Sequence, residues 1–337
     1  MDKSQYAGLL MKNAAPNEIT RQRLAPIRLL NLLVVCGLIF TQVLTSACSP
    51  SDSSPLQPTA SPSGPSSLPP TASSDSGCEL PRYPTPKCTG VPAGAALETV
   101  NGDVTVKTAG TQIVGKRITG SLSIQANSVV IRNSEILGAV VNWYDGGSWS
   151  FTIEDSTVGA EEGCSGDYTN FAIGVDNYVA RRVLVRGFPD GFRLGGPKDV
   201  TVEDSYVTLC VADPSDHSDG IQAYDAGGRS VIRHNVFDQR PAAETATAPI
   251  FLPAGQNRAS ASFVVTDNVV AGGTYSIRIM HNAPIVTGNK VEAGSWEYGP
   301  IDVDCSVIGE WRENAVVNFD FASGTITKEV EPSNDCS

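Results

Sequence analysis

A six-residue phrase recurs along most of this chain and limits the folds that it can adopt. It reads apolar–polar–polar–small–polar–apolar in "IRNSEI" (131), "IEDSTV" (153), "VEDSYV" (202), "IRHNVF" (232), "VTDNVV" (265), "VTGNKV" (286) and "WRENAV" (311), and more weakly in "ARRVLV" (180). Its fourth letters lie at 134, 156, 183, 205, 235, 268, 289 and 314, so steps run from 21 to 33 residues. Such short, β-branched copies are typical of strands, not helices.

A repeat of this length predicts stacked coils of short strands, with loops inserted at some corners, which is a parallel β-helix. The repeat from Cys88 onward, with "CTGVPAG" at 88, "HSDGIQ" at 217 and "YGPI" at 298, resembles the right-handed parallel β-helix proteins of the pectate-lyase-like superfamily, and in particular an exported actinobacterial type. The resemblance implies an all-β fold. It does not fix a reaction, because that superfamily contains lyases, hydrolases, epimerases, esterases and binders.

The chain divides into three parts by composition. Residues 1–47 combine basic residues with an apolar run that ends before Cys48, which indicates an export signal or membrane anchor. The "LTSAC" ending resembles a bacterial lipoprotein signal and favours Cys48 as a lipid anchor, with simple secretion and an uncleaved anchor as alternatives. Residues 48–77 are a Ser/Pro-rich linker, and residues 78–337 form the predicted β-helix domain. All three alternatives place this domain outside the cytoplasm, at the cell surface or in the medium.

Cysteine content and charge restrict the environment and the partners. Six cysteines follow Cys48, which permits three disulfides in an oxidising compartment, and Cys78–Cys88 and Cys305–Cys336 would staple the two ends. Of 24 basic and 36 acidic residues, five and two precede Cys48, so the rest carries −15. This balance argues against nucleic acid, since binding phosphates needs a basic surface. We expect a polysaccharide partner, a monomer, and contact with a membrane only through the N-terminal anchor.

A second strand follows each phrase, and its copies align. They read "FAIGVDN" (171), "DGFRLGG" (190), "DGIQAYD" (219), "APIFLPA" (248), "YSIRIMH" (275) and "GPIDVDC" (299). The third and fifth letters are apolar and are predicted to face the core. The fourth and sixth letters are then predicted to face outward, and they supply candidate substrate-binding residues: Asp176, Arg193, Gln222, Tyr224 and Arg278, with His281 at the end of its strand.

Two of these strands begin with Asp-Gly, at Asp190 and Asp219. Stacking would place the backbones of the two aspartates about 5 Å apart. Like charges so close raise the pKa of one of the two carboxyls unless a cation lies between them. In a hydrolase one aspartate would be the acid and the other the nucleophile or base. Aspartate before glycine is also a common turn pair, so a purely structural role is the competing interpretation.

Two further interpretations remain open. In a lyase, Asp190, Asp219 and Asp216 would hold calcium, and Arg278, Arg193 or His217 would remove a proton. In a non-catalytic glycan binder, only the outward arginines and aromatic residues would matter. Hydrolysis ranks first, with His217 and Arg278 as further catalytic candidates. The corner residues Asn235, Asn268, Asn289 and Asn314 are interpreted as structural, and His234 is expected to face solvent.

Overall fold

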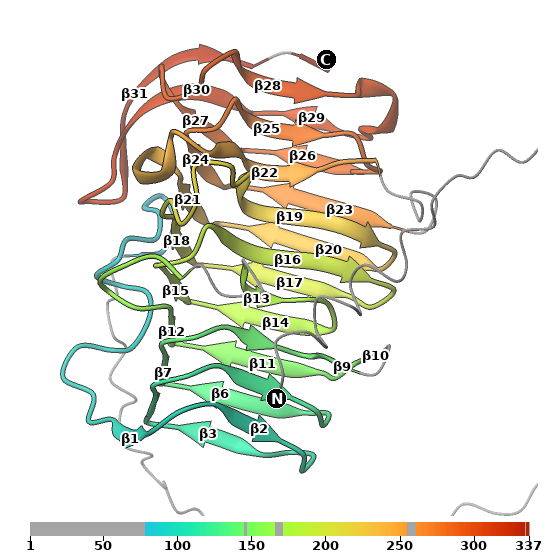
Figure 1. The fold of residues 1–337 in the computed structure, drawn as a ribbon. Coiled ribbons are helices and arrows are strands. Elements are labelled where there is room, and N and C mark those ends of the chain that lie inside the picture. The colour runs from blue at the N-terminus through green and yellow to red at the C-terminus, as the bar shows by residue number, and fades with distance from the viewer. Residues whose placement is uncertain (1–77, 145–146, 166–170, 255–260, 334, 337) are drawn as a thin grey trace, which may run out of the picture. The chain divides into compact units, whose positions relative to one another are not determined.

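The computed structural model describes residues 78–144, 147–165, 171–254, 261–333 and 335–336, and it is all-β with stacked parallel strands (Figure 1). The segments 1–47 and 48–77, including Cys48, lie outside the described residues. Within the described part, no helix has the length and apolar character needed to cross a membrane.

Each rung, meaning one circuit of the chain, contributes one strand to each of three sheets in turn, which is consistent with a parallel β-helix. Sheet I comprises β1 (Glu98–Val100), β4 (Lys116–Ile118), β7 (Glu135–Ile136), β12 (Thr157–Val158), β15 (Leu184–Val185), β18 (Tyr206–Thr208), β21 (Val236–Asp238), β24 (Val269–Ala271), β27 (Lys290–Glu292), β30 (Ala315–Asp320) and β31 (Thr325–Pro332). Sheet II comprises β3 (Gln112–Val114), β6 (Val129–Arg132), β11 (Phe151–Glu154), β14 (Tyr178–Arg181), β17 (Val200–Glu203), β20 (Arg229–Arg233), β23 (Ser262–Thr266), β26 (Ile285–Thr287) and β29 (Trp311–Arg312).

Sheet III comprises β2 (Val104–Val106), β5 (Leu122–Ile124), β8 (Val140–Val141), β13 (Phe171–Gly174), β16 (Asp190–Gly196), β19 (Ser218–Ala226), β22 (Ala246–Leu252), β25 (Tyr275–Ile279) and β28 (Gly299–Val303). The remaining elements are an antiparallel hairpin, β9 (Trp143–Tyr144) with β10 (Gly147–Ser148), and two short 3₁₀ turns, η1 (Arg240–Ala242) and η2 (Cys305–Val307).

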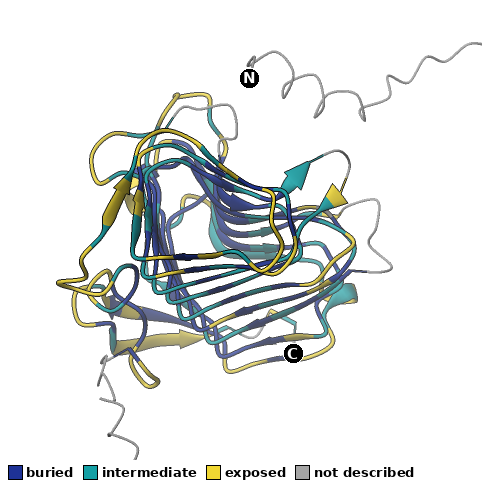
Figure 2. Ribbon diagram, turned by 90° about the horizontal axis from the view of Figure 1, so that it is seen from below, coloured by how far each residue is buried: buried dark blue, intermediate teal, exposed yellow. Residues whose placement is uncertain are grey.

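The predicted alignment of the sheet III strands is confirmed by their register. The third letters pair directly from rung to rung: Ile173, Phe192, Ile221, Ile250, Ile277 and Ile301. Five of these six are buried, and Ile301, in the last rung, is half-buried. Seen along the stack, buried residues run along the strands and exposed ones gather at turns and outlying loops (Figure 2). Apolar columns stacked in this way form one continuous core.

A column of buried polar side chains follows the corner between sheets II and I. Asn235 donates through Nδ2 to Asn268 Oδ1 (3.0 Å), Asn268 to Asn289 Oδ1 (2.9 Å), and Asn289 to Asn314 Oδ1 (3.0 Å). The predicted structural role of these asparagines is therefore confirmed. The left-handed backbone, however, belongs to the preceding residue, as at His234 (φ 54°) and Asp267 (φ 56°). The asparagine itself points inward, where its amide can bond to the next rung.

The first segment of the domain packs against this corner and buries His234. The side chain was expected to face solvent, but the residue is only 3% exposed. Its Nδ1 lies 2.7 Å from Asp204 Oδ1, and its Nε2 lies 2.8 Å from the carbonyl oxygen of Arg82. The expectation was wrong because the repeat itself contains no information about the chain segment that covers it.

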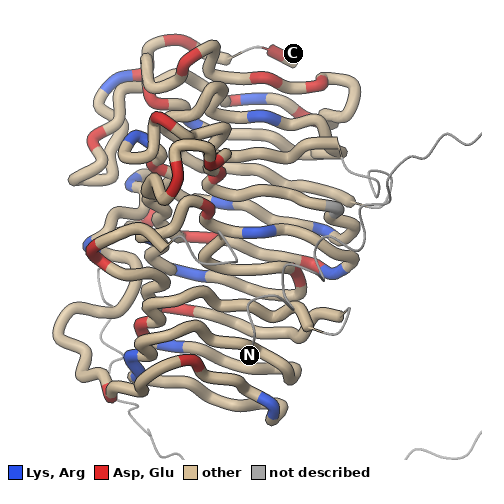
Figure 3. The backbone as a smooth tube through the Cα atoms, viewed as in Figure 1, with Lys and Arg blue, Asp and Glu red and all other residues tan. Residues whose placement is uncertain are grey.

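Three disulfides are present: Cys78–Cys88, Cys164–Cys210 and Cys305–Cys336. Cys78–Cys88 and Cys305–Cys336 are the two disulfides that were predicted at the ends of the domain. Disulfides indicate an oxidising, extracellular environment. At the C-terminal end, β31 pairs antiparallel with β30 and closes sheet I. Basic and acidic residues are interspersed over a largely uncharged stack (Figure 3).

We predict that Asn268→Ala lowers the free energy of unfolding by about 3 kcal/mol. The substitution removes the acceptor of the Asn235 backbone amide and of Asn235 Nδ2, and the side-chain donor to the Ile232 carbonyl. Asn289 Oδ1 loses one donor but keeps the Asn268 backbone amide. Each buried group left unsatisfied costs about 1–3 kcal/mol. Chemical denaturation measures the change. The exposed Asn318→Ala is the control and is expected to stay within about 0.5 kcal/mol of the wild type. Equal stability of the two variants would contradict a stabilising role for the column.

Candidate functional site

Asp190 and Asp219 occupy equivalent positions at the starts of β16 and β19. Phe192 pairs with Ile221, which places the two aspartates in the same column. The glycine after each has no room for a side chain: a Cβ on Gly191 would lie 2.2 Å from the Gly220 carbonyl oxygen, and one on Gly220 would lie 2.8 Å from the ring of the buried Phe237. Phe192 and Ile221, which follow these glycines, are core residues too, so strict alternation is interrupted at the starts of the two strands. The contact between Arg193 Nη2 and Asp190 Oδ2 places the Asp190 carboxylate beside the outward-facing Arg193.

Each carboxylate accepts a hydrogen bond from the backbone of the next rung. Asp190 Oδ1 accepts from the Asp219 amide (2.9 Å), and Asp219 Oδ1 accepts from the Ala248 amide (3.1 Å). To this extent the structural interpretation of the Asp-Gly pairs is correct. The second oxygens differ, since Asp190 Oδ2 accepts from Arg193 Nη2 (2.9 Å), whereas Asp219 Oδ2 is buried and has no hydrogen-bond partner among the described residues.

Burial shifts the proton affinity of both carboxyls in the same direction. It raises the pKa of Asp190 to about 6, an effect that the charge of Arg193 opposes. Burial also raises the pKa of Asp219 well above its ordinary value, and the neighbouring charge of Asp190 adds to this shift. The Ala248 amide, Arg193 and Arg278 act against it and lower the pKa of Asp219. Both carboxyls are therefore weaker acids than a free aspartate, Asp190 with a pKa of about 6 and Asp219 with a pKa raised well above its ordinary value.

Two arginines lie between aromatic rings on the outer face of sheet III. Arg193, Gln222, Phe251, Arg278 and Asp302 follow one another in register, as predicted for the fourth letters. The guanidinium of Arg193 lies 5.2 Å from the Phe171 ring and 5.9 Å from the Tyr224 ring, and that of Arg278 lies 5.3 Å from Phe251 and 5.5 Å from Tyr275. Arg278 also pairs with Asp302 at 3.0 Å. We call this face the sheet III wall.

The sheet III wall also carries exposed aromatic surface. Tyr224 is 64% exposed and Tyr298 is 68% exposed. The Tyr298 ring packs edge-on against Tyr275, with centroids 6.0 Å apart. Exposed aromatic faces beside charged groups can stack on sugar rings, so the wall has the chemistry of a glycan-binding surface.

Two predicted binding residues do not lie on this exposed wall. Asp176 is 1% exposed, and its Oδ2 accepts from the Lys198 amide (3.1 Å). His281 is fully buried, and its ring packs edge-on against Phe263 at 5.1 Å. The assumed alternation fails because β13 ends at Gly174 and β25 ends at Ile279, so both residues lie beyond their strands.

The loop before β19 carries two further candidates, and the charge of Asp216 adds to the raised pKa of Asp190. His217 is exposed, and Asp216 Oδ2 accepts from the Asp213 amide (2.8 Å) within its own loop. No three His, Cys, Asp or Glu side chains in the described part of the chain converge as metal ligands. The calcium site that the lyase interpretation places on Asp190, Asp219 and Asp216 stays a prediction.

Phe171 and Tyr275 belong to the wall but were not identified as candidates from the sequence. Phe171 pairs in register with Asp190, and Tyr275 pairs with Gly299. Both residues are first letters of the aligned strands, as are Asp190 and Asp219. The signal was therefore present in that column, although Phe171 and Tyr275 do not share the repeated Asp-Gly pattern.

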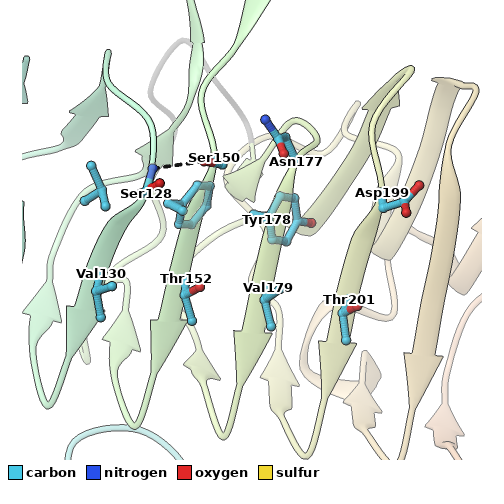
Figure 4. Close-up of a pocket in the computed structure, with 11 residues that line it drawn as sticks. Ser128, Val130, Ser150, Thr152, Asn177, Tyr178, Val179, Asp199 and Thr201 are labelled. Atoms are coloured by element: carbon cyan, nitrogen blue, oxygen red, sulfur yellow. Dashed lines mark hydrogen bonds between the residues drawn. The ribbon is translucent and has the colours of Figure 1, made fainter. Parts of the chain in front are cut away.

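A hollow of about 430 Å³ lies elsewhere, on the outer face of sheet II (Figure 4). It is lined by residues of β6, β11, β14 and β17 and of the turns before them, and it contains none of the predicted site residues. The aspartate pair and this hollow thus lie on different sheets.

The chain matches no protein-family model, and it has no significant match among curated proteins or among solved structures.

We predict that Asp190→Asn flattens the dependence of stability on pH between about pH 4 and pH 7. Folding raises the pKa of Asp190 to about 6, so this carboxyl favours the folded state fully below the unfolded pKa of about 4 and loses that contribution as pH rises through 6. Denaturant unfolding at four pH values should show the wild type losing about 1–3 kcal/mol more than the variant over this window. The exposed Glu244→Gln is the control, and a variant that follows the wild-type curve would contradict the assignment.

Proposed function

We propose that this chain is an exported, surface-tethered right-handed parallel β-helix of the pectate-lyase-like type that cleaves glycosidic bonds in a polysaccharide by hydrolysis, as a monomer. The observation that carries the proposal is the Asp190–Asp219 pair. Burial and the charge of Asp190 raise the pKa of Asp219 well above its ordinary value, and its Oδ2 has no hydrogen-bond partner among the described residues. Asp219 stands one rung from a carboxyl with a pKa of about 6. Carboxyl pairs with separated pKa values are what acid-assisted glycoside hydrolysis uses.

In this mechanism Asp219 protonates the oxygen of the leaving sugar. Neighbouring rungs are about 4.8 Å apart, which is closer to the roughly 5–5.5 Å carboxyl separation of retaining enzymes than to that of inverting ones. Asp190 is therefore proposed as the nucleophile. Its oxygen bonds to the anomeric carbon as the glycosidic C–O bond breaks, and water then releases the sugar and returns a proton to Asp219.

The remainder of the sheet III wall would hold the substrate. Arg193 and Arg278 would donate hydrogen bonds to sugar oxygens. The hydrogen bond from Arg193 to Asp190 Oδ2 must open before Asp190 can attack. Gln222 lies between them in the register, and Tyr224 and Tyr298 offer exposed rings for stacking. His217, exposed in the loop before β19, is retained as a contact at the edge of this wall.

We predict that Asp219→Asn reduces hydrolysis at least about 100-fold, because it removes the proton donor. The measurement is release of reducing ends from a panel of polysaccharides, with absorbance of unsaturated products recorded in parallel. Glu244→Gln is the matched control for loss of an exposed carboxyl and should retain full activity. Unchanged activity in Asp219→Asn would exclude Asp219 from the mechanism, and unsaturated products would show elimination instead.

A non-catalytic glycan-binding protein is the second candidate. The observation that favours it is the burial of the pair, since Asp219 is 1% exposed and both oxygens of Asp190 are already engaged. In that case Asp219→Asn would bind polysaccharide as the wild type does, with no product from either protein. Tyr224→Ala would weaken binding under both proposals, so product formation distinguishes them.

We further predict that Cys48→Ser moves the protein from the membrane fraction into the culture medium. The proposal of a lipid anchor rests on the "LTSAC" sequence followed by the Ser/Pro-rich linker. Fractionation of the producing bacterium, with labelled fatty acid as the readout of lipidation, measures the change. Cys36→Ser, which alters the other cysteine of this region, is the control and should leave the fraction and the label unchanged. Release of the wild type into the medium would contradict the anchor.

A further inference from the structure

The outer face of sheet II alternates in composition with a period of two rungs. Successive strands from β6 to β20 contain "VIR", "TIE", "VAR", "TVE" and "VIR", whose first and last letters face outward. Register places the first letters in one column and the last letters in another: Val130, Thr152, Val179, Thr201 and Val231 beside Arg132, Glu154, Arg181, Glu203 and Arg233. With rungs about 4.8 Å apart, both columns repeat about every 9.6 Å.

The alternation of the charged column is explained within the chain. Arg132 pairs with Glu154 at 2.6 Å, Arg181 pairs with both Glu154 and Glu203, and Arg233 pairs with Glu203 at 2.8 Å. Opposite charges on neighbouring rungs attract each other, so this column requires no ligand. Because the charges neutralise each other, the column offers little attraction to a charged polymer.

The alternation of valine and threonine has no such explanation. The side chains of Thr152 and Thr201 are half-buried on the outer face, and neither hydroxyl makes a side-chain hydrogen bond within the described residues. Valine would pack on this face equally well at every rung. The two hydroxyls are therefore available to a bound molecule, at intervals of two rungs.

These side chains form the floor of the 430 Å³ hollow. Figure 4 shows Val130, Thr152, Val179 and Thr201 side by side on neighbouring strands. Polar residues of the turns, including Ser150 and Asn177, line one edge of the hollow. The charged column, two residues further along each strand, lies on the other side. The result is a straight trough, perpendicular to the strands, with a floor that is alternately apolar and hydroxylated.

We propose that this trough binds an extended, uncharged, β-1,4-linked polysaccharide. Successive sugars of such a chain are turned over relative to one another, so the polymer repeats every second residue, as the floor does. One sugar per rung would place an apolar ring face over each valine and a sugar hydroxyl near each threonine. The site lies on sheet II and is independent of the proposed hydrolysis on sheet III, so the protein would hold a neutral glycan on a second face.

The test uses the full chain with suspensions of amorphous cellulose and chitin as probes and α-linked starch granules as the contrasting polymer. We expect depletion from solution by at least one β-linked polymer and none by starch. Val179→Arg places a long charged side chain across the trough and should weaken binding at least tenfold. Thr201→Lys, on the adjacent rung, carries the same test if Val179→Arg does not fold.

Two controls separate this proposal from its alternatives. Val264→Arg makes the same change in the same column but outside the hollow and the alternating rungs, and it should bind as the wild type does. Tyr224→Ala/Tyr298→Ala alters the sheet III wall, so binding by the trough is the part of the depletion that this double variant keeps and Val179→Arg loses. The proposal is overturned if neither β-linked polymer is bound, or if only the tyrosine variant loses binding. It is also overturned if the wild type sediments as a dimer that Val179→Arg dissociates, because the trough would then be a self-association surface.

Discussion

The fold depends on a constraint that acts between rungs: each rung must stack on the next without slipping by a residue. Backbone hydrogen bonds alone tolerate slippage, since every residue of a parallel strand offers the same donor and acceptor. The buried column through Asn235, Asn268, Asn289 and Asn314 removes that freedom, because each amide must meet its copy in the next rung. Serines take the same corner in earlier rungs, where Ser156 Oγ accepts from the Ser134 amide and Ser205 Oγ accepts from the Val183 amide. The Ser205 amide then donates to Asn235 Oδ1 and joins the two sets.

The aspartate pair shows how a scaffold position can acquire chemistry. Asp190 and Asp219 each bond to the backbone of the following rung, as a turn residue would. Stacking then brings two carboxyls together in a buried place, where desolvation raises both pKa values and the charge of Asp190 raises that of Asp219 further. The same contact between rungs that orders the chain thus also weakens the acidity of two carboxyls.

Much of the architecture could be predicted from the sequence because it is periodic. The inward column of Ile221, Ile250 and Ile277 and the outward column of Arg193, Gln222 and Arg278 follow from strand alternation. Asp176 and His281 could not be placed, because alternation ends where a strand ends, and strand ends depend on the turns. The burial of His234 depends on a segment more than a hundred residues earlier in the chain, about which local pattern contains no information.

The antiparallel strand β31 has a consequence for how copies of this protein meet. A stack of parallel rungs presents open strand edges at its ends, and such edges can recruit another copy and grow into filaments. β31 covers the last strand of sheet I in the opposite direction, and most of its residues, including Lys328, Glu329 and Glu331, are exposed. An incoming chain would face a charged edge of the wrong polarity there, which keeps an otherwise extendable architecture at a finite length.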